Sequence, residues 1–222
     1  MKKMMAKKKA LQSPNTEVRA IKGIYALTPD SIDTEDLLHR ARLALAGGVR
    51  VLQYRNKIAD AALRIKQARA LRELTREYGA TYIVNDDAQL AVLVDADGVH
   101  LGATDGDIKA ARALLGHDRL IGASCYNKLA LARDAAKAGA DYVALGAFYA
   151  STVKPDAAVA TLDLLRDARA ALDVPIVAIG GISADNGAAL VEAGADALAV
   201  ISAVFDAADI ELAARNLAKL FR

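Results

Sequence analysis

The stretch A-G-A-D-Y-V-A-L-G-A-F, residues 138–148, joins the end of a predicted helix to a complete apolar strand. Gly139 predicts the helix end, because glycine is the favoured residue just beyond a helix C-terminus. The run from Tyr142 to Phe148 lacks polar alternation, which is typical of a parallel strand covered on both faces. The junction recurs as A-G-A-D at 193–196, before the apolar run A-L-A-V-I-S-A. A repeated helix–glycine–strand unit therefore decides the fold class.

Eight short apolar runs, rich in Val, Ile and Leu, follow one another along the chain. They begin at Gly23, Val49, Thr81, Gly98, Leu120, Asp141, Pro175 and Ala197. Stretches with helical periodicity separate them, most clearly at 33–48 and 62–79. Such units, without a Pro/Ser-rich linker, predict an α/β fold, a (β/α)8 TIM barrel, in a single domain over residues 21–222. A doubly wound sheet is the alternative, but residues 23–30 lack the glycine-rich fingerprint that it needs.

Charge is unevenly distributed along the 222-residue chain. Its formal net charge is +2, and much of the positive excess lies at 1–10. We predict a disordered basic tail over 1–20 and no nucleic-acid partner. No apolar run approaches the ~20 residues that span a bilayer, and none follows the basic start, so neither a membrane partner nor a signal peptide is predicted. The single cysteine, Cys125, excludes an internal disulfide framework and favours a cytoplasmic location. A homo-oligomer is compatible with these features.

Polar residues stand at the predicted carboxyl ends of the strands. Those ends carry the chemistry of (β/α)8 barrels, so these residues are the candidates for the site. They are Gln53, Arg55, Lys57, Asn85, Asp86, Asp105, Ser124, Ser151, Thr152, Lys154 and Ser202, and Gly181 and Ile201 join them at the ends of the last two strands. The set contains no Ser-His-Asp or Cys-His pair, which argues against a protein nucleophile.

The charged members of this set predict a metal–diphosphate site. Arg55, Lys57 and Lys154 would repel one another in one cleft unless an anion bound between them. Asp86 and Asp105 would repel that anion unless a hard cation bridged them, and Mg²⁺ is typically held by one or two carboxylates plus substrate phosphates. Each acid could instead cap the helix that follows it.

A second anion site is predicted after the last two strands. Gly180 and Gly181 follow the seventh apolar run, and the segment 203–207 could form a short helix whose N–H groups bind a monophosphate. A double glycine is weak on its own, since turns use it constantly. Two alternatives stay open elsewhere: Lys154 as a Schiff-base lysine, and His100 either inside the barrel or, as we favour, packed in the core.

Seven segments, taken together from about Gly23 to Phe205, resemble the thiamine phosphate synthase family. The joint pattern is specific, whereas any one piece is not. The segments are Q-Y-R-N-K (53–57), N-D-D (85–87), D-G-V-H-L-G-A-T-D (97–105), G-A-S-C (122–125), G-A-F-Y-A-S-T-V-K (146–154), A-I-G-G-I (178–182) and A-V-I-S-A (199–203).

The resemblance implies a Mg²⁺-dependent transferase that joins hydroxymethylpyrimidine diphosphate to thiazole phosphate, giving thiamine phosphate and pyrophosphate. Asp86 and Asp105 would bind Mg²⁺, and Gln53 would face the pyrimidine. Catalytic contacts to the diphosphate would come from Arg55, Lys57, Ser124 and Lys154, with Asn85 beside them. The remaining substrate contacts would be Tyr54, Asn56, Ser151, Thr152, Val153, Gly181, Ile201 and Ser202.

One departure from the family pattern concerns the segment before Lys154. The family usually shows Thr-x-Thr-Lys, whereas this chain has Ser151, Thr152 and Val153, so the second hydroxyl is replaced by a methyl group. Three alternatives therefore remain: a thiazole tautomerase on the same barrel, a Schiff-base aldolase, and a non-catalytic sensor of thiamine precursors. Activity without Mg²⁺ would favour the tautomerase, and borohydride trapping would detect the aldolase.

Overall fold

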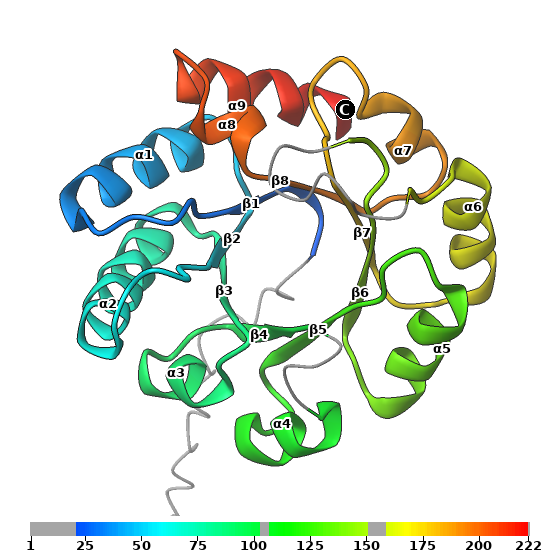
Figure 1. The fold of residues 1–222 in the computed structure, drawn as a ribbon, viewed down its shortest axis with the longest axis horizontal. Helices are drawn as coiled ribbons and strands as arrows, with labels where there is room; N and C mark the ends of the chain where they lie inside the picture. The colour runs from blue at the N-terminus through cyan, green and yellow to red at the C-terminus, as the bar shows by residue number, and fades with distance from the viewer. Residues whose placement is uncertain (1–20, 103–106, 151–158, 222) are drawn as a thin grey trace, which may run out of the picture.

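A closed barrel of eight parallel strands occupies the centre of the described residues, 21–102, 107–150 and 159–221, in the computed structural model (Figure 1). Each strand pairs with the next along the chain, and β1 closes on β8. The strands are β1 Gly23–Leu27, β2 Val51–Tyr54, β3 Thr81–Asn85, β4 Gly98–Leu101, β5 Leu120–Ser124, β6 Tyr142–Gly146, β7 Ile176–Ile179 and β8 Ala197–Val200. The predicted (β/α)8 barrel is confirmed, and the doubly wound alternative is wrong.

Helices surround the barrel and cover its outer face (Figure 1). They are α1 Thr34–Ala46, α2 Ala61–Tyr78, α3 Ala88–Leu93, α4 Ile108–Leu115, α5 Leu129–Ala138, α6 Leu162–Ala171, α7 Ala188–Glu192, α8 Ser202–Phe205 and α9 Ile210–Ala218, followed by the 3-10 turn η1 Lys219–Phe221. Among the helices so described, none is long and apolar enough to cross a membrane. The predicted basic tail at 1–20 lies outside the described residues.

Strand side chains separate into two packed layers. Because successive side chains point to opposite faces, one set fills the barrel interior, including Tyr25, Val51, Ile83, Tyr142 and Val177. The other set packs against the helices and forms the larger cluster. A strand residue that faces the interior near the carboxyl end of its strand therefore faces the mouth of the barrel.

The A-G-A-D junctions hold the strands in register through their aspartates. Gly139 ends α5 in the left-handed conformation, with φ 102°, as the sequence predicts. Asp141 Oδ2 then accepts a hydrogen bond from Ile121 N of β5 at 2.7 Å and one from Arg112 Nη2 of α4 at 2.5 Å. The second junction repeats the arrangement: Asp196 Oδ2 accepts from Ile176 N at 2.8 Å. The aspartates thus join a helix and two strands at the amino end of the barrel.

The same clamp occurs a third time at a junction that sequence reasoning missed. Asp97, just before β4, accepts from Tyr82 N of β3 at 2.8 Å and forms two bonds with Arg72 of α2, at 3.0 and 2.9 Å. Both side chains are more than nine-tenths buried. A cavity of about 840 Å³ opens beside this pair. It lies at the amino ends of the strands, the end that serves stability in this fold.

Candidate active site

A cavity of about 760 Å³ opens at the carboxyl ends of the strands. It collects most of the described residues that sequence reasoning proposed for the site. Those that line it are Gln53, Arg55, Lys57, Asn85, Asp86, Ser124, Gly181, Ile201 and Ser202. The predictions for Asp105, Ser151, Thr152, Val153 and Lys154 fall outside the described residues.

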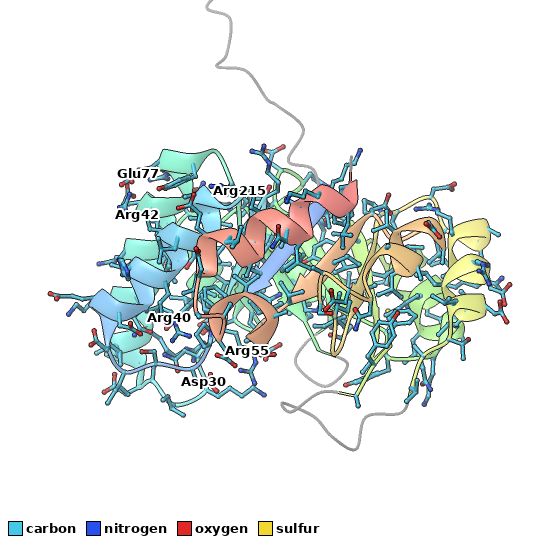
Figure 2. The ribbon with its side chains drawn as sticks, turned by 90° about the horizontal axis from the view of Figure 1, so that it is seen from above. Asp30, Arg40, Arg42, Arg55, Glu77 and Arg215 are labelled. Carbon is cyan, nitrogen blue, oxygen red and sulfur yellow. The ribbon has the colours of Figure 1, made fainter. Side chains whose placement is uncertain are left out.

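The end of β2 presents two cations that the chain after β1 holds in place. Thr28 Oγ1 donates to Arg55 O and accepts from Arg55 N, both at 2.9 Å. Asp30 Oδ1 lies 3.3 Å from Arg55 Nη1 and accepts from Lys57 N at 2.8 Å. Figure 2 shows Asp30 and Arg55 together at one end of the barrel. Sequence reasoning missed Asp30, although it follows β1 as Asp86 follows β3.

Asp86 directs its carboxylate across the end of β4. Its φ of 62° is left-handed, a conformation in which Asp and Asn are over-represented among non-glycine residues. Oδ1 accepts from Gly102 N at 3.3 Å, and Oδ2 accepts from Asn85 Nδ2 at 2.5 Å. The helix-capping alternative for Asp86 is wrong, because Asp87 caps α3 by accepting from Leu90 N at 2.8 Å.

Two predicted substrate-binding residues lie away from the cavity. Tyr54 donates its hydroxyl proton to Gln67 Oε1 of α2 at 2.8 Å. Asn56 Nδ2 donates to the same oxygen at 2.9 Å and to Ser31 O at 2.6 Å. Tyr54 faces the helices because its neighbours on β2 face the interior. In this structure both side chains fasten α2 to the barrel, and their contact with substrate stays a prediction.

A chain of hydrogen bonds crosses the floor of the cavity inside the barrel. Gln53 Nε2 donates to Tyr25 Oη at 2.7 Å, and the hydroxyls of Tyr25 and Tyr142 lie 2.8 Å apart. The Tyr142 hydroxyl is 3.1 Å from His100 Nδ1, and His100 Nε2 is 2.9 Å from Ser124 Oγ. His100 is buried, as we favoured, but its ring lies inside the barrel and lines the cavity.

Burial lowers the pKa of His100 from 6.5 to about 4. The unfolded chain therefore binds a proton that the folded chain rejects between these values, so stability should fall as pH falls through 6.5 toward 4. From about pH 7.5 to about pH 5 we expect His100 to cost about 2 kcal/mol of unfolding free energy. Urea unfolding of the wild type and a His100→Gln variant checks this. An equal pH dependence in both proteins would contradict it.

The glycine pair after β7 forms a tight turn at the cavity wall. Gly180 and Gly181 have φ of 106° and 62°, and a Cβ on Gly181 would lie 2.3 Å from Ala150 O. On the neighbouring strand, Ile201 follows β8 and precedes α8, which begins at Ser202. The short helix expected at 203–207 is confirmed with shifted bounds. These residues place backbone N–H groups beside the cavity, as an anion site needs.

The barrel, and a cavity at the carboxyl ends of its strands lined by cations and a carboxylate, define a (β/α)8-barrel enzyme. A family model described as thiamine monophosphate synthase matches residues 24–204. The chain is 56% identical over 201 residues to a thiamine-phosphate synthase of Methylobacillus flagellatus, covering 90% of this chain and 96% of that protein. The chain belongs to the thiamine monophosphate synthase family, which confirms the resemblance seen in the sequence.

Two further comparisons agree. The chain is 56% identical over 201 residues to a thiamine-phosphate synthase of Chromobacterium violaceum, covering 90% of this chain and 97% of that protein. Among solved structures, thiamine phosphate pyrophosphorylase from Pyrococcus furiosus superposes with a TM-score of 0.81 at 37% identity. That match covers 90% of this chain and 95% of the other.

Proposed function

We propose that the chain joins hydroxymethylpyrimidine diphosphate to thiazole phosphate and releases thiamine phosphate and pyrophosphate. The observation that carries this proposal is the shared cavity lined by Arg55 and Lys57, which follow β2, and by Asp86, which follows β3. Membership of the family supports the same reaction. The partners are therefore small molecules.

The reaction replaces one bond to carbon by another. The carbon–oxygen bond to the diphosphate breaks, and the thiazole nitrogen supplies the electron pair of the new carbon–nitrogen bond. Negative charge builds on the leaving oxygens, where Arg55 and Lys57 stabilise it. The electron-rich aminopyrimidine carries the positive charge on the carbon side. No protein nucleophile is needed, and the role of the site is to hold the two substrates in line.

Mg²⁺ fits the donor set. Asp86 offers a carboxylate at the cavity, with Asn85 as a neutral donor beside it. Among the described residues, no group of three or more His, Cys, Asp or Glu side chains could hold a metal ion. One or two carboxylates plus substrate phosphates is the usual arrangement for Mg²⁺, so Asp86, with Asp105 as the sequence predicts, would hold it. The ion would supply further positive charge at the leaving oxygens.

In this proposal the pyrimidine lies at β2, and the phosphate of the thiazole substrate lies at the ends of β7 and β8. Gln53 is 2% exposed, and its Oε1 has no hydrogen-bond partner among the residues that the structure describes. It therefore suits an N–H donor on the pyrimidine. Gly181, Ile201 and Ser202 would bind the thiazole phosphate, largely through backbone N–H groups.

Pyrophosphate release from the purified protein tests the proposal. The pyrimidine diphosphate, the thiazole phosphate and Mg²⁺ are each omitted in turn, and thiamine phosphate is measured by mass spectrometry. We expect release to require all three. Isomerisation of a thiazole without Mg²⁺ would point to a tautomerase, and saturable binding without turnover would point to a sensor; either result would overturn the proposal.

We also propose a cytoplasmic location, which the single, buried Cys125 supports because reducing compartments disfavour disulfides. A homo-oligomer stays a prediction, and sedimentation measures it directly.

A further inference from the structure

The hydrogen-bond chain beneath the cavity has a direction. Its members come from five strands, and each is buried except Ser124, which is partly exposed at the cavity. Gln53 Nε2 donates to Tyr25, so the Tyr25 proton is available to the next hydroxyl, Tyr142. A buried hydroxyl that accepts one bond donates another where a partner lies within reach. Tyr142 then donates to His100 Nδ1.

His100 transmits this direction to the edge of the cavity. The buried ring has a hydroxyl partner at each nitrogen, and a neutral imidazole accepts at one nitrogen and donates at the other. Acceptance at Nδ1 leaves the proton on Nε2, which donates to Ser124 Oγ. The Ser124 proton then points to the cavity as a donor. At the opposite end of the chain of hydrogen bonds, Gln53 Oε1 stays an acceptor with no partner within the described ranges 21–102, 107–150 and 159–221.

If every hydrogen bond in the chain ran the other way, Ser124 would no longer be a donor to the cavity and Gln53 would no longer be an acceptor. Ser124 would donate to His100, and a turned Gln53 amide would present its NH₂ group to the cavity. A diphosphate has no proton to give at neutral pH and needs donors, whereas the amino group of an aminopyrimidine needs an acceptor. Only the first direction suits both ligands.

We infer that Tyr25, Tyr142 and His100 are positioning residues that hold Gln53 as an acceptor for the aminopyrimidine and Ser124 as a donor to the diphosphate. This inference rests on the proposed function and deepens it. In this inference, binding of the pyrimidine ring at Gln53 and stabilisation of the leaving diphosphate at Ser124 depend on the same hydrogen-bond chain. Its three middle residues act through Gln53 and Ser124 rather than on a substrate.

Removing one hydroxyl breaks the chain. Tyr142→Phe keeps the aromatic ring in place but removes the hydroxyl that donates to His100. The ring packs so closely on Gly122 that a Cβ added there would lie 2.0 Å from it. We expect kcat to fall about tenfold, the effect of one lost orienting hydrogen bond. Tyr82→Phe is the matched control, because Tyr82 is equally buried and donates to Ala68 O at 3.0 Å, on the helix side of the barrel. It should keep wild-type kcat.

Two binding readouts separate positioning from a merely structural role. Nitrogen NMR of the labelled His100 ring, with pyrophosphate and Mg²⁺ as the probe, should show the proton on Nε2 in the wild type and a mixture of tautomers in Tyr142→Phe. Competitive binding of hydroxymethylpyrimidine and its deamino analogue should favour the amino compound about tenfold or more in the wild type. Tyr142→Phe should reduce that preference, while Tyr82→Phe keeps it.

Results that contradict the positioning inference differ from results that contradict the proposed function. A wild-type proton on Nδ1, or wild-type kcat and ring preference in Tyr142→Phe, would overturn the inference even if thiamine phosphate forms. If Tyr142→Phe does not fold, Tyr25→Phe interrupts the chain one link earlier, and the wild-type tautomer still decides. Absence of thiamine phosphate with all components present would instead reject the proposed function.

Discussion

Replacing Asp86 by Asn should reduce turnover by at least ~10²-fold, because metal stabilisation of a leaving group is worth several kcal/mol. The change removes the charge without straining the backbone, and the Asn85 amide, which donates to Asp86 Oδ2, then has to turn its oxygen toward the new NH₂ group. Asp86 has φ 62°, which Asn adopts readily, and an Asn oxygen can still accept the bond from Gly102 N. Steady-state pyrophosphate release at saturating Mg²⁺ measures the effect.

The adjacent carboxylate provides the control. Asp87 caps α3 and lies 3.0 Å from Arg64, and Asn is an equally good cap. Asp87→Asn should therefore keep turnover while losing only the partly exposed ion pair. Near-normal rates in Asp86→Asn would remove this residue from the metal site.

Asp97→Asn should lower the free energy of unfolding by about 3–5 kcal/mol, the typical cost of leaving a buried charge without its partner. The Arg72 side chain is 9% exposed and donates two hydrogen bonds to Asp97, one from each terminal guanidinium nitrogen. An Asn in this place turns an N–H₂ group toward one of the Arg72 donors. Urea unfolding followed by circular dichroism gives the difference.

Glu77→Gln is the matched surface variant. Glu77 pairs with Arg42 at 2.7 Å, but both side chains are about half exposed, and Figure 2 shows them at the outer surface. Solvent screening makes the contribution of such exposed pairs to stability small. A similar loss in Asp97→Asn and Glu77→Gln would mean that the Asp97 clamp does not hold the register of β3 and β4.

The fold was predictable because its signals are local and repeated. Each apolar run marks a strand that is buried on both faces, and glycines such as Gly139 mark the helix ends. What the sequence does not display is the partner of each junction aspartate. Asp97 and Arg72 meet only after two strands and a helix pack together, so nothing in the spacing distinguishes Asp97 from a solvated loop residue.

The candidate site was predictable at strand ends and less so within a motif. Gln53 and Arg55 reach the cavity, whereas Tyr54 between them faces α2, because a strand alternates its side chains. Alternation along β2 therefore separates Tyr54 from the cavity-lining members of its motif. The hydrogen-bond chain Tyr25–Tyr142–His100 could not be predicted for another reason. Its residues are distant in sequence, and each one alone has the pattern of a buried core residue.

Calorimetric binding of inorganic pyrophosphate, with and without Mg²⁺, tests whether the cavity holds a metal-bound diphosphate. We predict binding at least about tenfold tighter with Mg²⁺, and loss of that difference in Asp86→Asn. Equal affinity for pyrophosphate with and without Mg²⁺ in the wild type would mean that the cavity does not bind the diphosphate through a metal ion.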